Sequence, residues 1–429
     1  DLLHELEKAS GRDLKAWSAK WLEESGINTI ATEVEENADG TIASLTLNQT
    51  APAEHPVLRP HRLAVGFYDE DPATGKIVRT DRFELDVDGE STVVAAAAGK
   101  KRPAFILVND DDLTYTKLRF DADSLSFALA NLQRFDDALA RAVVWLSLWD
   151  MTRDGDLAAE KFIDTTLALL ATETESTTFR YALSCMSTTA WHYTAPDRRA
   201  DVVKHVAKEL WKLVIAAPGG SDQQFQLVTA YLGYGEEGDA EFAEHAQGLF
   251  DGSLIVAGLE IDNNFTWTII NALSSVKLID QAGIDAQLAK RDTTENREFA
   301  LGAHAVRGDA AAKEWAWIEA LNNADLTNMQ LEAVARGFGA TPRPDLAEPY
   351  AAKYYDVVDW VWKNKSFHMA EALLEGLYPY YADPATLVEL GHRWLADHED
   401  ADNALKRIVR GNVESSQRTL KVRDFNAAL

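Results

Sequence analysis

Two stretches of the sequence decide the fold: Val108-Asn-Asp-Asp-Asp112-Leu-Thr-Tyr115 and Leu139-Ala-Arg-Ala-Val-Val-Trp145-Leu-Ser-Leu-Trp149-Asp-Met-Thr-Arg153-Asp-Gly155. The first ends a region in which apolar and polar residues alternate, as they do in half-buried strands. The second belongs to a region in which apolar residues recur at helical spacing, with Trp145 and Trp149 one turn apart. The sequence therefore predicts a β-rich part followed by an α-helical part.

The boundaries of these parts follow from where the spacing changes. Alternation fills residues 29–120, which predicts an antiparallel β-sandwich of about six to eight strands. Helical spacing fills residues 121–429 in pieces of roughly 10 to 20 residues, which predicts about 15 helices in a superhelical, HEAT/ARM-like α-solenoid domain. Residues 1–28 are predicted to form a single amphipathic helix over residues 4–24 and a linker.

Length, charge and cysteine content indicate a protein of more than one domain and make several classes of partner improbable. A chain of 429 residues is too long for one hydrophobic core. Its net charge of −27 disfavours nucleic acid and anionic membranes as partners, and no apolar run approaches the ~20 residues that span a bilayer. The single cysteine, Cys185, suits a reducing compartment and predicts a cytoplasmic location. The chain opens at Asp1 without a methionine, which favours a trimmed fragment.

The two opening stretches resemble the region that follows the catalytic domain in zinc aminopeptidases of the aminopeptidase N family. Similarity to the same family continues in two further stretches, Ser10-Gly-Arg-Asp13…Trp17…Trp21…Gly26-Ile-Asn-Thr29 and Pro349-Tyr350…Tyr354-Tyr355…Leu374-Glu-Gly-Leu-Tyr378-Pro379. The resemblance implies that residues 1–28 contain the last helix of a catalytic domain and that the sandwich is a spacer. It also implies that the helical domain closes over the zinc cleft to form a peptide chamber.

This resemblance further implies two partners, the catalytic domain of the same parent chain and a peptide substrate, from which the parent enzyme would release N-terminal amino acids. Zinc chemistry of this kind needs H-E-x-x-H on a helix, because histidines four residues apart present both rings to one metal. The nearest string, His4-Glu-Leu-Glu-Lys8, has lysine where the second ligand belongs. We therefore predict no catalytic residue, metal ligand or cofactor in this chain, zinc only in the parent enzyme, and no activity of the chain alone.

The helix that contains Trp145 and Trp149 is predicted to place both rings in the core, because Ala138 and Ala142 extend the same stripe and let a neighbouring helix interdigitate. Charged residues on this helix suggest an ion-pair cluster that braces the junction between sandwich and helices. Its predicted members are Arg141, Asp150, Arg153 and Asp154.

The acidic run from Asn109 to Asp112 allows two interpretations. Hard cations bind several oxygens, but the run lacks the spaced ligands of a calcium loop. We favour a solvated turn in which Asp and Asn side chains accept hydrogen bonds from nearby backbone amides.

The last helix gives the one hypothesis about substrate contact. Residues 403–424 contain six basic and two acidic side chains, a local excess of positive charge in an acidic chain. Cations near a helix C-terminus often only complement the helix dipole. The functional alternative is that Arg407 and Arg410 bind the C-terminal carboxylate of a peptide, since arginine pairs with carboxylates bidentately.

A second class of function remains open from sequence alone. A free-standing α-solenoid adaptor would bind a protein partner on its concave face. An H-E-x-x-H motif encoded upstream would distinguish the enzyme from the adaptor.

Overall fold

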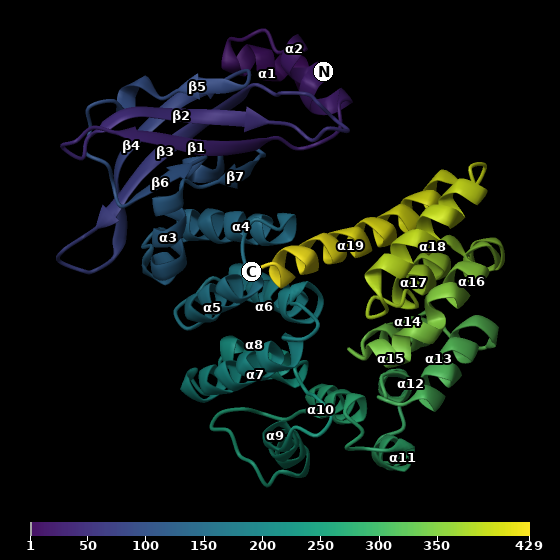
Figure 1. Ribbon diagram of the computed structural model, residues 1–429. Coiled ribbons are helices and arrows are strands. Elements are labelled where there is room, and N and C mark those ends of the chain that lie inside the picture. Colours follow the sequence, from purple (N-terminus) through teal and green to yellow (C-terminus); the bar gives the residue numbers. More distant parts are fainter. Residues whose placement is uncertain (1) are drawn as a thin grey trace. The chain divides into compact units, whose positions relative to one another are not determined.

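The computed structural model describes residues 2–429, which divide into two compact units that separate between Ala182 and Leu183. The first unit contains the N-terminal helices, all the strands of the described residues and the first helices that follow them (Figure 1). The second unit, as far as it is described, is built of helices. The predicted fold class, a β-sandwich followed by a large all-α part, is confirmed; the three predicted domain boundaries stay predictions.

The N-terminal segment is not the single helix predicted over residues 4–24. It forms α1 (Leu2–Ser10), α2 (Lys15–Ser18) and a π-helical turn, η1 (Ala19–Glu23). Gly11 ends α1 because it adopts a left-handed conformation, with φ of 69°, that costs glycine no side-chain clash. Arg59 holds the segment against the sandwich, since its guanidinium donates to backbone carbonyls of Lys20, Glu24 and Ser25.

In the described part of the chain, seven strands form the sandwich: β1 (Thr29–Glu36), β2 (Ile42–Thr50), β3 (His61–Glu70), β4 (Ile77–Val87), β5 (Ser91–Val93), β6 (Phe105–Val108) and β7 (Lys117–Arg119). One sheet has the order β5-β2-β1-β7 and the other the order β4-β3-β6. All four residues of β6 are buried, as its unbroken apolar sequence indicates. The sheets are antiparallel except where β7 pairs with β1 in parallel, because the chain crosses between the sheets after β6.

Within residues 2–429, seventeen α-helices follow the strands, slightly more than predicted. They are α3 (Ala122–Asn131), α4 (Ala138–Asp154), α5 (Ala159–Leu170), α6 (Ser176–Thr188), α7 (Arg199–Ala216), α8 (Asp222–Leu232), α9 (Ala240–Asp251), α10 (Asn263–Ser275), α11 (Gln281–Lys290), α12 (Thr294–Ala305), α13 (Ala310–Asn322), α14 (Asn328–Gly339), α15 (Pro344–Ala347), α16 (Ala351–Asn364), α17 (Phe367–Gly376), α18 (Pro384–Asp397) and α19 (Asn403–Ala427).

Aspartate side chains start many of these helices. Asp137, Asp239, Asp309 and Asp402, for example, accept hydrogen bonds from backbone N–H groups in the first turn. A carboxylate at this position satisfies an otherwise unpaired donor and complements the positive end of the helix dipole. Part of the chain's negative charge therefore has a structural cause.

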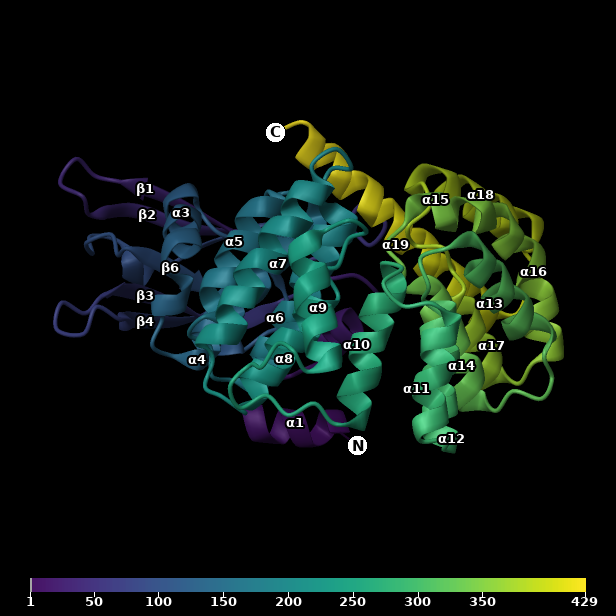
Figure 2. The same ribbon diagram turned by 90° about the horizontal axis from the view of Figure 1, so that it is seen from below.

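Small residues let three helices of the second unit, α12, α14 and α17, approach at backbone distance (Figure 2). A Cβ atom at Gly337 of α14 would lie 2.6 Å from the carbonyl oxygen of Gly302 in α12. A Cβ atom at Gly376 of α17 would lie 2.8 Å from the Cβ of Ala335 in α14. Only glycine permits these contacts, so glycine fixes the spacing of the layer that presents the candidate site.

Helix α19 joins the end of the second unit to its beginning. Arg423 Nε donates a hydrogen bond of 2.7 Å to the carbonyl oxygen of His192, in the π-helical turn η5 (Thr189–Tyr193) that follows α6. The His192 ring stacks on Tyr381 with a centroid separation of 4.7 Å. Burial, followed by the charge of Arg423, lowers the pKa of His192 to about 3, so this ring is neutral.

Candidate functional site

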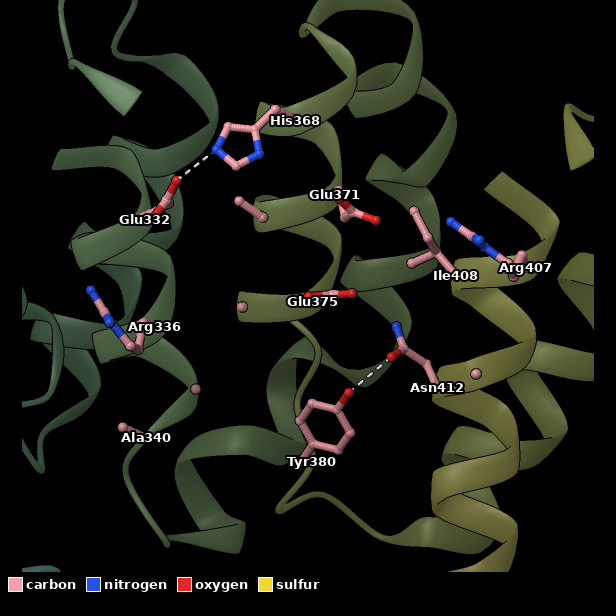
Figure 3. Close-up of a pocket in the computed structure, with 14 residues that line it drawn as sticks. Glu332, Arg336, Ala340, His368, Glu371, Glu375, Tyr380, Arg407, Ile408 and Asn412 are labelled. Atoms are coloured by element: carbon pink, nitrogen blue, oxygen red, sulfur yellow. Dashed lines mark hydrogen bonds and ion pairs between the residues drawn. The ribbon is translucent and has the colours of Figure 1, made fainter. Parts of the chain in front are cut away.

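A pocket of about 900 Å³ opens between α14, α17 and α19 of the second unit (Figure 3). Each helix contributes ionisable side chains: Glu332 and Arg336 from α14, His368, Glu371 and Glu375 from α17, and Arg407 from α19. Basic and acidic side chains therefore line one concave site, where placed polar groups can orient a ligand.

The floor of the pocket is a satisfied hydrogen-bond network. Tyr380 donates from its hydroxyl to Asn412 Oδ1 at 2.9 Å. The Asn412 amide in turn donates to the Tyr354 hydroxyl at 3.0 Å and to the Leu374 carbonyl. Burial raises the pKa of both tyrosines above the ordinary value, so both hydroxyls keep their protons. The floor is therefore fixed, and α17 and α19 are held together beneath the opening.

The charges at the opening are mostly unpaired. His368 Nε2 lies 3.0 Å from Glu332 Oε1. Within the described residues, the four other ionic side chains of the pocket form no hydrogen bond or ion pair; they are Arg336, Glu371, Glu375 and Arg407. Figure 3 shows Glu371 and Glu375 pointing away from α14, on the side where Arg407 lies. Such groups are free to exchange water for a ligand.

The two arginines predicted to contact substrate differ in their positions. Arg407 lines the pocket. Arg410 is exposed on the same helix and is not among the described residues that line it. Sequence reasoning missed Glu332, Glu371 and Glu375, because glutamates four residues apart are common on solvated helix faces and nothing local marks these as facing a pocket.

The tryptophans of α4 lie in the core of the first unit. Trp145 is 1% exposed and its ring lies 5.8 Å from that of Phe162, while Trp149 packs on the same ring at 5.4 Å. The Trp145 indole N–H donates to Thr166 Oγ1 at 3.2 Å. Both side chains have the packing role that the stripe of the sequence indicates.

Of the four charged residues predicted to cluster, Asp150, Arg153 and Asp154 lie near one another at the end of α4, and Arg141 lies apart. Arg141 pairs with the buried Glu173 at 2.8 Å, near the opposite end of the helix from Asp154. Asp150 and Arg153 lie 4.0 Å apart.

Asp154 ties α4 to the sandwich, as the predicted bracing of the junction requires. It accepts hydrogen bonds from Lys117 and Arg119 of β7, each with a shortest distance of 2.6 Å. Burial alone would raise the pKa of Asp154, but these two cations outweigh it and hold the pKa below its usual value.

The acidic turn after β6 is the solvated turn expected from sequence only in part. Asp112 is exposed and Asn109 Oδ1 accepts a hydrogen bond of 3.0 Å from the Thr114 N–H, but Asp110 belongs to a buried, paired network. Asp110 is 1% exposed; it accepts a hydrogen bond of 2.6 Å from the Tyr68 hydroxyl and one of 2.7 Å from Arg79. Arg79 and Arg82 also hold Asp111. The carboxylates are neutralised by arginines, which the sequence places more than twenty residues earlier.

The described residues do not fit a zinc site. Within residues 2–429, no three His, Cys, Asp or Glu side chains are grouped so that they could hold a metal ion. The same part of the chain has no helix that combines the length and apolar character needed to cross a membrane.

Comparison with known proteins places this architecture in a family. Residues 105–418 match the family described as ERAP1-like C-terminal domain. The whole chain aligns with "Aminopeptidase N" of Streptomyces lividans, with 36% identity over 434 residues. The chain belongs to the aminopeptidase N family. It spans about half the length of this relative, 50%, and represents the non-catalytic C-terminal part of an aminopeptidase N-like enzyme.

Proposed function

We propose that this part of an aminopeptidase N-like enzyme closes over the active-site cleft of the catalytic domain to form a peptide chamber. The parent enzyme would bind zinc in its catalytic domain and release N-terminal amino acids from peptides in the cytoplasm. The printed name of the relative and its twofold greater length support this assignment. The residues of this chain then bind and orient peptide and take no part in bond cleavage.

The observation that supports peptide binding most directly is the unpaired Arg407 in the pocket. A peptide with its N-terminus at the metal presents its C-terminal carboxylate elsewhere in the chamber, and a guanidinium binds a carboxylate through two parallel hydrogen bonds. Arg410, exposed one turn further along α19, can add attraction but does not line the pocket.

Charge reversal in the full-length enzyme tests this proposal. Arg407→Glu should raise KM for a free-acid peptide by roughly tenfold, the scale of one charge-assisted hydrogen-bonded pair, with little effect on the C-terminal amide of the same peptide. Arg410→Glu, the matched control on the same helix, should have a smaller effect. Equal changes for acid and amide would reject the carboxylate contact, and a full-length enzyme without aminopeptidase activity would reject the proposed function.

A further inference from the structure

Helix α17 contributes two carboxylates to the pocket between α14, α17 and α19, those of Glu371 and Glu375. Neither has a role in the proposed binding of a peptide carboxylate by Arg407. Glu371 and Glu375 lie four residues apart on α17, so both face the same side of the helix. Like charges at this spacing destabilise a helix unless a cation lies between them. Neither glutamate has an ion pair or hydrogen bond to another described residue, so the protein itself supplies no such cation.

None of the described basic side chains that line the pocket neutralises Glu371 or Glu375. His368, three residues before Glu371, is paired with Glu332. Arg336 and Arg407 project from the two neighbouring helices and form no ion pair with the glutamates. The pocket therefore presents negative charge on its middle helix and positive charge on α19, with neither neutralised by the other.

The space beside these charges suits a long side chain. A Cβ atom at Gly411 of α19 would meet no atom within 4 Å, and Gly411 lines the same pocket. Ala372 on α17 is a further small lining residue. Ile408 offers apolar surface next to Arg407, against which the methylene stem of a lysine or arginine can pack while its charged end reaches a carboxylate.

We propose that Glu371 and Glu375 bind the basic side chain of a peptide's C-terminal residue while Arg407 binds the carboxylate of that residue. The ligand class is a peptide that ends in lysine or arginine, whose two opposite charges match the two charged helices of the pocket. This inference rests on the proposed function for the presence of a peptide, and it names the peptide's preferred C-terminal residue.

Binding of labelled peptides to the 429-residue chain tests the inference without any contribution from catalysis. Three peptides of identical body would end in lysine, norleucine or glutamate, and each would be measured by fluorescence anisotropy as free acid and as amide. We expect the lysine peptide to bind roughly tenfold more tightly than the norleucine peptide, and the glutamate peptide to bind most weakly. The lysine preference should decrease as salt is raised.

Two variants assign this preference to the pocket. Glu371→Gln with Glu375→Gln should remove the preference for lysine and leave the norleucine peptide unaffected, whereas Glu314→Gln, an exposed position on α13 outside the pocket, should change neither. Glu375→Lys should invert the preference toward the glutamate peptide. Thermal melts of each variant show whether the fold is retained.

The outcomes separate this inference from the proposed function. Equal affinity for lysine and norleucine, no binding of the lysine peptide, or a lysine preference that survives the double substitution would overturn it. A lysine preference that persists equally in acids and amides would leave the glutamate contact standing and reject the carboxylate contact of Arg407.

Discussion

The two units neutralise their buried charges in different ways. In the first unit, the buried Asp110 meets the Arg79 guanidinium at 2.7 Å and the Tyr68 hydroxyl at 2.6 Å. In the second unit, the buried Lys313 meets only neutral oxygens, among them the carbonyls of Ala305 at 2.8 Å and Phe338 at 3.0 Å. The buried carboxylate of the first unit is held by an ion pair, whereas the buried lysine of the second unit is held by carbonyl and hydroxyl oxygens.

The largest effect should come from breaking the network of the first unit. Asp110→Ala removes one partner of a buried pair and leaves the Tyr68 hydroxyl and Arg79 without it, which should cost about 3 to 5 kcal/mol of unfolding free energy. Chemical denaturation measures this loss. Asp112→Ala, at an exposed position of the same turn, is the matched control and should cost far less. A loss below about 1 kcal/mol for Asp110→Ala would show that the network does not hold the turn.

The next largest loss of stability should come from adding a methyl group where two helices of the second unit touch. Gly376→Ala forces a Cβ atom to 2.8 Å from Ala335, where helices α14 and α17 touch, and should destabilise by about 1 to 3 kcal/mol. Gly411→Ala places its Cβ in open space on α19 and should stabilise by up to about 1 kcal/mol, because alanine favours a helix over glycine. Thermal unfolding of the two variants should shift in opposite directions; a common direction contradicts the packing argument.

The buried lysine predicts a pH dependence in the alkaline range. Burial lowers the pKa of Lys313 to about 7, while an unfolded lysine titrates near 10.4. Between these values the unfolded state binds the extra proton, so the free energy of unfolding should rise with pH from about 7 to about 10, by at most about 1.4 kcal/mol per pH unit. Lys313→Met should lack this contribution. Parallel pH profiles of the wild type and Lys313→Met would show that Lys313 is not the titrating group.

The smallest effect should come from the pocket. Glu375→Gln removes repulsion with Glu371 and should stabilise the chain by about 0.2 to 0.5 kcal/mol. Glu389→Gln on α18 removes an attraction instead, since Glu389 lies 2.6 Å from Arg393 one turn later, and should destabilise slightly. If calorimetric melting temperatures rise for Glu375→Gln and fall for Glu389→Gln, the Glu375 carboxylate is unpaired. A lower melting temperature for Glu375→Gln would indicate a partner for that carboxylate.

Local patterns predicted the elements but not the contacts between them. The unbroken apolar run of β6 and the tryptophan stripe of α4 predicted that these residues are buried. Strand and helix periodicity can be recognised within a few consecutive residues. The burial of Asp110 was missed because its partners Tyr68 and Arg79 lie on β3 and β4, 42 and 31 residues earlier in the sequence. The pocket was missed for the same reason, since Arg336, Glu371 and Arg407 are brought together only by helix packing.

The contact between Arg423 and His192 has a consequence for folding that we expect from its long span in the sequence. Stacked helical arrays ordinarily fold by local contacts, so that each repeat can form soon after its neighbour is synthesised. This hydrogen bond spans 231 residues, and contacts between distant residues slow folding because a long loop must close first. Because α19 follows η5 in the chain, this contact can form only after α19 has been synthesised. We therefore expect the unit to fold with the cooperativity of a closed loop and not with the independence of a linear stack.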